Sequence, residues 1–324
     1  MDDQELKMDA ILSSPRGFCA GVVRAVEIVE VCLEKFGSPV YVRHEIVHNK
    51  YVVDDLRLKG AIFVEELSEV PDSANVVFSA HGVPPAVWGD AATRNLNVID
   101  ATCPLVTKVH LESIKFSEED YSIIVVGHEG HPEVIGTMGQ SPSSSQLVGS
   151  VAEAKEIQVT DPSRVVALTQ TTLSVEDTKE IIETLRTRFP KLISRNDICY
   201  ATTNRQDAVS ELAKKVDVVL VIGAQNSSNC NRLREVAEQM GVRAFLVDDA
   251  SHIDPLWLKD VQTVGVTSGA STPETLVQEV VAWLNPNNVH SLDVVHENVT
   301  FTMPEKLRER NKWAIPRKAS DLPH

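Results

Sequence analysis

Short runs rich in valine and isoleucine alternate with longer helical stretches, and this alternation limits the fold more than any other feature. The runs are too short for helices, and their composition is typical of buried strands. They lie at 11–12, 40–42, 76–78, 98–99, 123–126, 165–168, 218–222 and 264–266. Between them, apolar residues recur at helical spacing, as at Val22, Val26, Val29, Leu33 and Phe36. Strands that alternate with helices predict an α/β fold with mostly parallel sheets.

The 324 residues of the chain are more than one compact core usually holds. Cys19, Cys103 and Cys199 recur at intervals of 84 and 96 residues, each in a predicted strand-to-helix loop. From this layout we predict three related α/β units arranged around a central site. Their predicted bounds are 21–102, 103–198 and 199–284, with an N-terminal extension and first strand at 1–20 and a C-terminal extension at 285–324 that wraps or frays.

Charge and hydropathy exclude several classes of partner. With 31 Lys and Arg against 46 Asp and Glu, the formal net charge is -15, which argues against nucleic-acid binding. No apolar run is long enough to span a bilayer. The acidic start lacks the features of a signal peptide. Five cysteines form no C-x-x-C pair, so we expect reduced thiols in the cytoplasm.

Polar and small residues cluster after nearly every predicted strand. In parallel α/β sheets, ligand sites form beyond the carboxyl ends of the strands. We therefore expect one site built from several units. The clusters lie at 13–19, 44–49, 79–82, 100–104, 127–133, 169–172, 199–204, 226–229 and 268–271.

Cys19, Cys103 and Cys199 lie at or near predicted helix N-termini. Pro104 favours a helix that begins just after Cys103, and the pattern Thr203-x-x-Gln206 predicts a capping box after Cys199. The positive end of a helix lowers the pKa of a thiol and favours the metal-binding thiolate. Three converging thiolates would leave one coordination position of a metal group open. Three unrelated buried thiols are the alternative.

The other two cysteines, Cys32 and Cys230, have a different setting. Each recurs with apolar residues at helical spacing. We therefore predict that both pack in the core as small apolar side chains.

His44-Glu45-Ile46-Val47-His48 matches the H-E-x-x-H pattern of zinc peptidases. That mechanism needs both histidines on one helix face, whereas this segment connects a predicted strand to a helix over 50–58 capped by Asn49. We therefore do not favour a zinc hydrolase. His44 is predicted to form a local hydrogen bond in the loop, and His48 is a candidate contact for an anion or substrate.

Further candidates lie in the other loops. His81 precedes Gly82, where the backbone could approach a ligand. His131 and Glu133 share one loop and contain the parts of a proton-delivery pair. The helix starts at 226–229 and 271–274 suit phosphate binding but are equally ordinary caps.

Taken together, these motifs resemble those of the 4-hydroxy-3-methylbut-2-enyl diphosphate reductase family, which catalyses the last step of the non-mevalonate isoprenoid pathway. The resemblance extends from residue 11 to residue 284. It rests on Pro15-Arg16-Gly17-Phe18-Cys19-Ala20-Gly21-Val22, His44-Glu45-Ile46-Val47-His48-Asn49, Ser79-Ala80-His81-Gly82-Val83, Asp100-Ala101-Thr102-Cys103-Pro104-Leu105-Val106, and the segments 127–133, 169–172, 197–205 and 226–232.

The resemblance implies a fold, a cofactor and a set of roles. Three α/β units would surround a [4Fe–4S] cluster held by Cys19, Cys103 and Cys199, with one iron free for the substrate hydroxyl. Glu133 would deliver a proton, with His131 and Thr171 beside it. The substrate diphosphate would be held by His48, His81, Ser227, Ser228, Asn229 and Ser271. Electrons would come from a small redox protein such as ferredoxin or flavodoxin.

Two further expectations follow from this resemblance. A carboxyl near a diphosphate should have a raised pKa, because like charge disfavours its ionised form. This would apply to Glu133. The alternative function is a non-catalytic iron–sulfur redox sensor on the same fold, which would need neither a proton donor nor an anion pocket.

Overall fold

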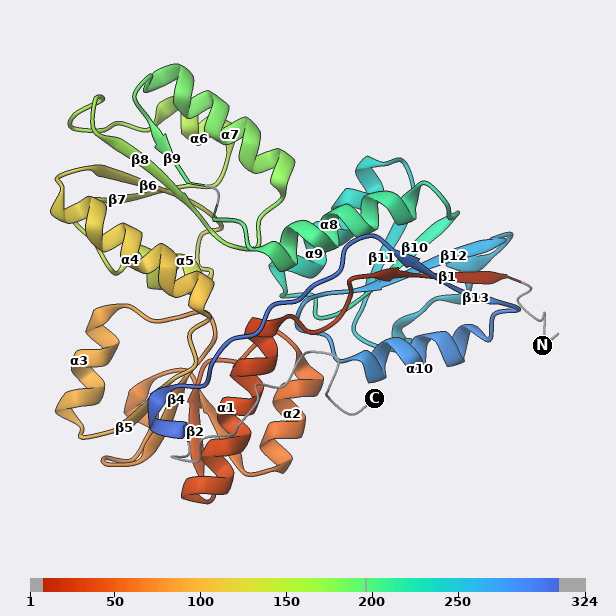
Figure 1. Ribbon diagram of the computed structural model, residues 1–324, viewed down its shortest axis with the longest axis horizontal. Helices are drawn as coiled ribbons and strands as arrows, with labels where there is room; N and C mark the ends of the chain where they lie inside the picture. Colours follow the sequence, from red (N-terminus) through yellow and green to blue (C-terminus); the bar gives the residue numbers. More distant parts are fainter. Residues whose placement is uncertain (1–7, 196, 309–324) are drawn as a thin grey trace.

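The computed structural model describes residues 8–195 and 197–308, and in it three parallel sheets form three lobes (Figure 1). Every strand pair in this part of the chain is parallel. The predicted α/β class with three parallel-sheet units is therefore confirmed. The outer parts of the two predicted extensions, residues 1–7 and 309–324, lie outside the described residues.

The first sheet has the order β3-β2-β4-β5. Its core packs the apolar face of α1 against inward-facing valines of the sheet, because helical and strand periodicities present matching apolar surfaces. Its elements are α1 (Ala20–Phe36), β2 (Val40–Arg43), α2 (Lys50–Leu58), β3 (Ala61–Val64), β4 (Asn75–Phe78), α3 (Pro85–Thr93) and β5 (Asn97–Asp100).

The second sheet has the order β7-β6-β8-β9. Strands β6 and β8 are almost wholly buried and lie at its centre, between helices on both faces. Its elements are α4 (Pro104–Glu118), β6 (Ser122–Val126), α5 (Pro132–Met138), β7 (Ser145–Val148), α6 (Val151–Glu156), β8 (Val165–Thr169), α7 (Val175–Arg188) and β9 (Ile193–Ser194).

The third sheet combines the two ends of the described chain. Its order is β11-β10-β12-β1-β13, so the first strand of the protein lies between two of the last. Residues 289–293 of the predicted C-terminal extension thus form its edge strand. Its elements are β1 (Asp9–Ser14), α8 (Tyr200–Ala213), β10 (Val218–Ile222), α9 (Ser228–Gln239), β11 (Arg243–Val247), β12 (Thr263–Ser268), α10 (Glu274–Leu284) and β13 (Val289–Asp293).

One predicted helix start was wrong. Helix α8 begins at Tyr200 with Cys199 as its N-cap, so Thr203 lies inside the first turn. The Cys199 thiol accepts the backbone N–H of Thr202 at 3.4 Å. Gln206 does not complete a capping box; its amide hydrogen-bonds the backbone at Leu173 and Val175.

No helix in residues 8–195 and 197–308 is long and apolar enough to cross a membrane. Four short 3₁₀ helices complete the described structure. They are Leu67–Glu69, Ala250–His252, Pro255–Leu258 and Glu305–Leu307.

Candidate active site

A cavity of about 110 Å³ lies where the three units meet, and all twelve predicted site residues line it. They come from loops and helix starts at the carboxyl ends of strands in all three sheets, where parallel sheets place ligands. The residues are Cys19, His48, His81, Cys103, His131, Glu133, Thr171, Cys199, Ser227, Ser228, Asn229 and Ser271.

The three cysteines are the N-cap residues of α1, α4 and α8. None is in a disulfide. A Cβ at Gly21 would lie 2.8 Å from the Cys103 sulfur and 3.7 Å from the Cys19 sulfur, so the first turn of α1 adjoins both thiols. Only glycine leaves room for them at this position.

The predicted lowering of the thiol pKa was wrong for two of these cysteines. Burial raises the pKa of Cys103 to about 12 and that of Cys199 to about 11, and the neighbouring Cys19 adds to both shifts. The loss of solvation exceeds the effect of the helix N-termini. Both thiols are therefore protonated at neutral pH unless a cation binds beside them.

The donor set restricts what the three thiols can bind. Among residues 8–195 and 197–308, no three His, Cys, Asp or Glu side chains converge closely enough to hold a single metal ion. Soft thiolate ligands select soft metals and iron–sulfur clusters.

Glu133 and Thr171 form a buried pair beside the thiols. The Thr171 backbone N–H donates to Oε1 of Glu133 at 2.6 Å, and the Thr171 hydroxyl donates to Oε2 at 2.9 Å. Only 3% of Glu133 is exposed, and burial raises its pKa to about 7 despite these bonds. The raised pKa was predicted, but its main cause here is desolvation.

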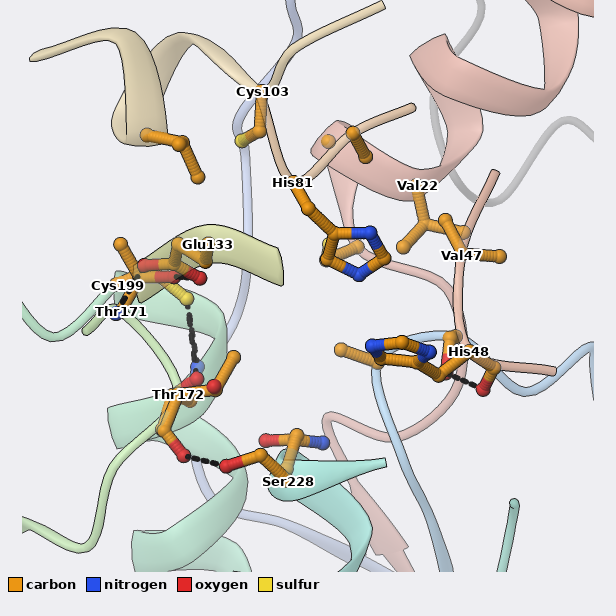
Figure 2. Close-up of a pocket in the computed structure, with 18 of the residues that line it drawn as sticks. Val22, Val47, His48, His81, Cys103, Glu133, Thr171, Thr172, Cys199 and Ser228 are labelled. Atoms are coloured by element: carbon orange, nitrogen blue, oxygen red, sulfur yellow. Dashed lines mark hydrogen bonds between the residues drawn. The ribbon is translucent and has the colours of Figure 1, made fainter. Parts of the chain in front are cut away.

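Three imidazoles line the same pocket. His48 and His81 lie across it from Glu133 and Thr171 (Figure 2), and His131 is the N-cap of α5, next to Glu133. His48 stacks on His81 with ring centroids 4.3 Å apart, and both meet His131 edge to face at 5.6 and 5.8 Å. Nδ1 of His131 accepts the Glu133 backbone N–H at 3.2 Å. Burial lowers the pKa of His131 to about 3, so this ring is neutral with its proton on Nε2.

Several polar atoms in the pocket lack internal partners. Within the part of the chain that the structure describes, Nε2 of His48 and both amide atoms of Asn229 are buried without a hydrogen bond. Unsatisfied buried groups cost free energy, so their retention at one place indicates a ligand that pairs with them.

Contacts between units hold this polar region together. The Ser271 hydroxyl donates to the His48 carbonyl at 2.9 Å, and the Ser228 hydroxyl donates to the Thr172 carbonyl at 3.1 Å. Ser227 caps α9 by accepting the backbone N–H of Cys230. Ser271 thus joins the third unit to the first, and Ser228 joins it to the second.

His44 does not line the pocket. Its Nδ1 is hydrogen-bonded to Glu65 at 2.7 Å, so the predicted hydrogen bond is present, but its partner lies after β3 and not in the same loop. His44 and His48 therefore do not line one pocket as a zinc hydrolase would require. Cys32 and Cys230 are fully buried in apolar clusters, as predicted.

The structure adds two pocket residues, and one residue bonded to a pocket histidine, that the sequence alone did not single out for function. Thr202 hydrogen-bonds the Cys199 thiol, and Thr172 lies beside Thr171. Glu45 accepts Nδ1–H of His48 at 3.0 Å, which lowers the pKa of its carboxyl. All three lie inside motifs already noted, so a search of motif neighbours would have found them.

Comparisons with known proteins agree over nearly the whole chain. The family model described as LytB protein matches residues 10–285. A protein of Aromatoleum aromaticum named 4-hydroxy-3-methylbut-2-enyl diphosphate reductase is 56% identical over 95% of this chain and 99% of its own length. A Streptomyces avermitilis protein of the same name is 54% identical over 92% of this chain and 90% of its own.

Solved structures show the same likeness. The E-1-hydroxy-2-methyl-but-2-enyl-4-diphosphate reductase of Plasmodium falciparum superposes with a TM-score of 0.90 at 38% identity, over 93% of this chain and 96% of that one. A second reductase structure, described as the terminal enzyme of the non-mevalonate pathway, gives a TM-score of 0.62 at 32% identity, over 86% and 99%. The chain belongs to the LytB protein family.

Proposed function

We propose that this protein reduces 4-hydroxy-3-methylbut-2-enyl diphosphate to isopentenyl diphosphate and dimethylallyl diphosphate. The reaction consumes two electrons and two protons and releases the allylic hydroxyl as water. The observation that carries the proposal is the single pocket, which combines three thiols, a buried carboxyl–hydroxyl pair and unpaired polar groups. The names of the relatives support the same activity.

The three thiols fit a [4Fe–4S] cluster with one iron that has no protein ligand. Cys19, Cys103 and Cys199 would hold it, since the donors are soft, each comes from a helix start, and all three line one pocket. Gly21 leaves room beside the sulfurs of Cys19 and Cys103. When bound, the cluster supplies electrons and a Lewis-acidic iron for the leaving hydroxyl. Its positive metal ions would also offset the burial that raises the pKa of Cys103 and Cys199.

Glu133 and Thr171 supply the proton. Oε1 of Glu133 already accepts a backbone N–H, so in the protonated form the acidic proton lies on Oε2. The hydrogen bond to Thr171 is then reversed, and Oε2–H donates to the Thr171 hydroxyl oxygen. A pKa of about 7 keeps a large part of the carboxyl protonated near neutral pH. Thr171 can accept that proton while its own hydroxyl proton goes to the substrate. Such acid catalysis contributes about 10²–10⁴-fold to a rate.

The imidazole and amide groups bind the diphosphate. The neutral His131 offers Nε2–H as a donor, and Asn229 offers an amide N–H that has no partner in the described residues. His48 gives Nδ1–H to Glu45, so pairing its Nε2 with a phosphate oxygen requires the imidazolium form. Ser227 and Ser228 add the N-terminus of α9, a favourable place for an anion.

The electron donor is proposed to be a small redox protein of the ferredoxin or flavodoxin kind, and the cytoplasm is proposed as the place of action. The residues of the pocket do not distinguish between these two classes of donor. A direct test is to measure which reduced donor supports turnover of the purified enzyme.

The decisive experiment is anaerobic purification followed by measurement of iron, acid-labile sulfide and turnover. About four iron and four sulfide per chain, with substrate consumed in the presence of a strong reductant, would support the proposal. Zinc without sulfide after an anaerobic reconstitution attempt would overturn it. A full cluster without turnover would instead favour the redox-sensor alternative, although a sensor would not need the Glu133 pair or the orphaned polar atoms.

A further inference from the structure

The chain after β13 follows a long path that the proposed chemistry does not explain. Residues 294–308, here named the C-terminal strap, run from the third unit across the molecule to the first (Figure 1). At the far end, Leu307 is buried with residues of α1 and the first sheet. Lys306 donates to the carbonyl of Val98 at 2.9 Å, and Lys35 of α1 donates to the Lys306 carbonyl at 2.7 Å.

Arg205 ties the strap to the loop of the first cysteine. It is the largest fully buried side chain of the described residues, and all five of its N–H groups are used. Two donate to the carbonyl of Gly17, at 3.2 and 2.8 Å, and one to the carbonyl of Ala201 at 3.0 Å. The other two reach Glu297 of the strap, at 2.9 and 3.3 Å.

These bonds fix two cysteines relative to each other. Gly17 lies two residues before Cys19, while Ala201 lies in the first turn of the helix that Cys199 caps. A second hydrogen bond joins this turn to the Cys19 segment, because the Tyr200 hydroxyl accepts the N–H of Ala20 at 3.1 Å. A buried guanidinium without its carboxylate is strongly unfavourable, so this arrangement depends on Glu297.

Arg24 makes the equivalent connection to the third cysteine. From α1 it donates to the carbonyls of Ala101 and Thr102, at 3.3 and 3.0 Å, directly before Cys103. Its Nε donates to the carbonyl of Thr302 in the strap at 2.8 Å. Two arginines thus hold backbone carbonyls one or two residues before a cysteine, and both are tied to the strap.

We propose that the C-terminal strap is a positioning element for the iron–sulfur cluster, acting on the Cys19 and Cys199 segments through Arg205 and on the Cys103 loop through Arg24. The inference rests on the proposed function, because it presumes that the three thiols bind one group. Groups that orient metal ligands from outside typically change metal affinity about 10–100-fold when removed. Neither arginine contacts the substrate region, so the expected effect is on cluster retention.

The test uses Glu297→Gln and Arg24→Gln in the full chain, alone and combined. Glu297→Gln removes the partly exposed carboxylate that pairs with Arg205. Arg24→Gln breaks only the connection between the strap and the loop before Cys103. Arg57→Gln is the matched control, since Arg57 forms an exposed ion pair with Asp54 on α2. Each protein is reconstituted without oxygen, and loss of cluster absorbance is followed after adding an iron chelator.

We expect each strap variant to lose iron about 10-fold faster than the parent chain, and the combined variant to lose it faster than either. The control should match the parent. The unfolding midpoint of each apoprotein is measured in parallel, and the spectrum of the reduced cluster should change in the strap variants only. Equal iron release in all proteins, or faster release that only follows a lower apoprotein midpoint, would overturn the proposal.

Failure of the proposed function would give a different result. If the parent chain takes up no iron and sulfide at all, the cluster assignment is wrong. If the parent holds a full cluster and the strap variants hold it equally well, only the role of the strap is wrong.

Discussion

Burial shifts pKa values in opposite directions at the two ends of the pocket, here named the thiol end and the imidazole end. At one end, burial raises the pKa of Cys103 and Cys199 and keeps them neutral. At the other, burial lowers the pKa of His81 and His131, so these rings are also neutral. Between them, the buried Glu133 has a pKa of about 7.

The comparison shows what each end requires. The thiol end gains from positive charge, because thiolates form only when a cation offsets their desolvation. The imidazole end gains from negative charge, because the amide N–H of Asn229 has no acceptor in the described chain and the neutral His131 presents Nε2–H. In the proposed function, a metal group and an anionic substrate would each supply the charge that one end lacks.

Replacing a cysteine of the thiol end should give the largest effect. Cys199→Ser is expected to abolish stable cluster binding and turnover, because serine does not provide the soft thiolate ligand that the cluster needs. Iron and sulfide content after anaerobic reconstitution is the measurement. Cys32→Ser and Cys230→Ser are the controls and should retain the cluster, since both thiols lie in apolar cores. A fully loaded Cys199→Ser protein would remove this residue from the ligand set.

Replacing Glu133 should give the next largest effect. Glu133→Gln keeps an acceptor for the Thr171 N–H and fills the same volume, but it has no acidic proton. Turnover should fall about 10²–10⁴-fold, with cluster content and substrate binding retained. Single-turnover kinetics beside a binding measurement separates these quantities. Normal turnover in this variant would exclude Glu133 as the proton source.

The same carboxyl should leave a signature in the pH dependence of stability. Its pKa is about 7 in the folded apoprotein, against 4.5 for an ordinary glutamate. Between these values the folded state binds more protons than the unfolded state, so this group's contribution falls as pH rises through that window. The loss is roughly 3 kcal/mol.

His131 has a lowered pKa and acts in the opposite direction, favouring the folded state as pH rises from about 3 towards 6.5. The useful quantity is therefore the difference between the parent chain and Glu133→Gln, from denaturant unfolding at several pH values. A difference that stays constant between pH 4.5 and pH 7 would show that Glu133 titrates normally.

The smallest expected effect comes from the imidazole end. Asn229→Ala removes two amide atoms that have no hydrogen bond in the described structure, so stability should hardly change. A lost hydrogen bond to a charged ligand costs about 1.5–3 kcal/mol, and KM should rise about 10–100-fold. Asn288→Ala, which loses only a surface contact with Asp9, is the control. An unchanged KM would exclude Asn229 from the anion site.

Whether a strand could be predicted from the sequence depended largely on its place in the sheet. All eight predicted strands are present, whereas β3, β7, β9, β11 and β13 were missed, and each of the five lies at a sheet edge. Edge strands are covered on fewer sides and need fewer apolar residues, as the exposed β13 shows. This reason does not cover β3 and β11, which are apolar edge strands that were missed all the same. Central strands such as β10 are buried throughout and have a clear apolar run.

The candidate site was easier to predict than its electrostatics. Twelve residues proposed from motifs line one pocket, because the carboxyl ends of parallel strands bring separate motifs together. The pKa direction of Cys103 and Cys199 was wrong, since the balance between burial and a helix terminus depends on how closely the three units pack. The contacts of Arg24, Arg205 and Glu297 join residues up to 278 positions apart and have no local pattern.

The place of β1 in the third sheet has a consequence for how the protein is made. This strand leaves the ribosome first among the described strands, yet it pairs only with β12 and β13. At about 5–20 residues per second, the chain between β1 and β12 takes roughly 10–50 s to synthesise. The first and second sheets contain only strands from the intervening chain and can form in that interval. The loop that carries Cys19 reaches its final place only after β1 pairs, so the proposed metal centre would be completed only after nearly all of the protein has been translated.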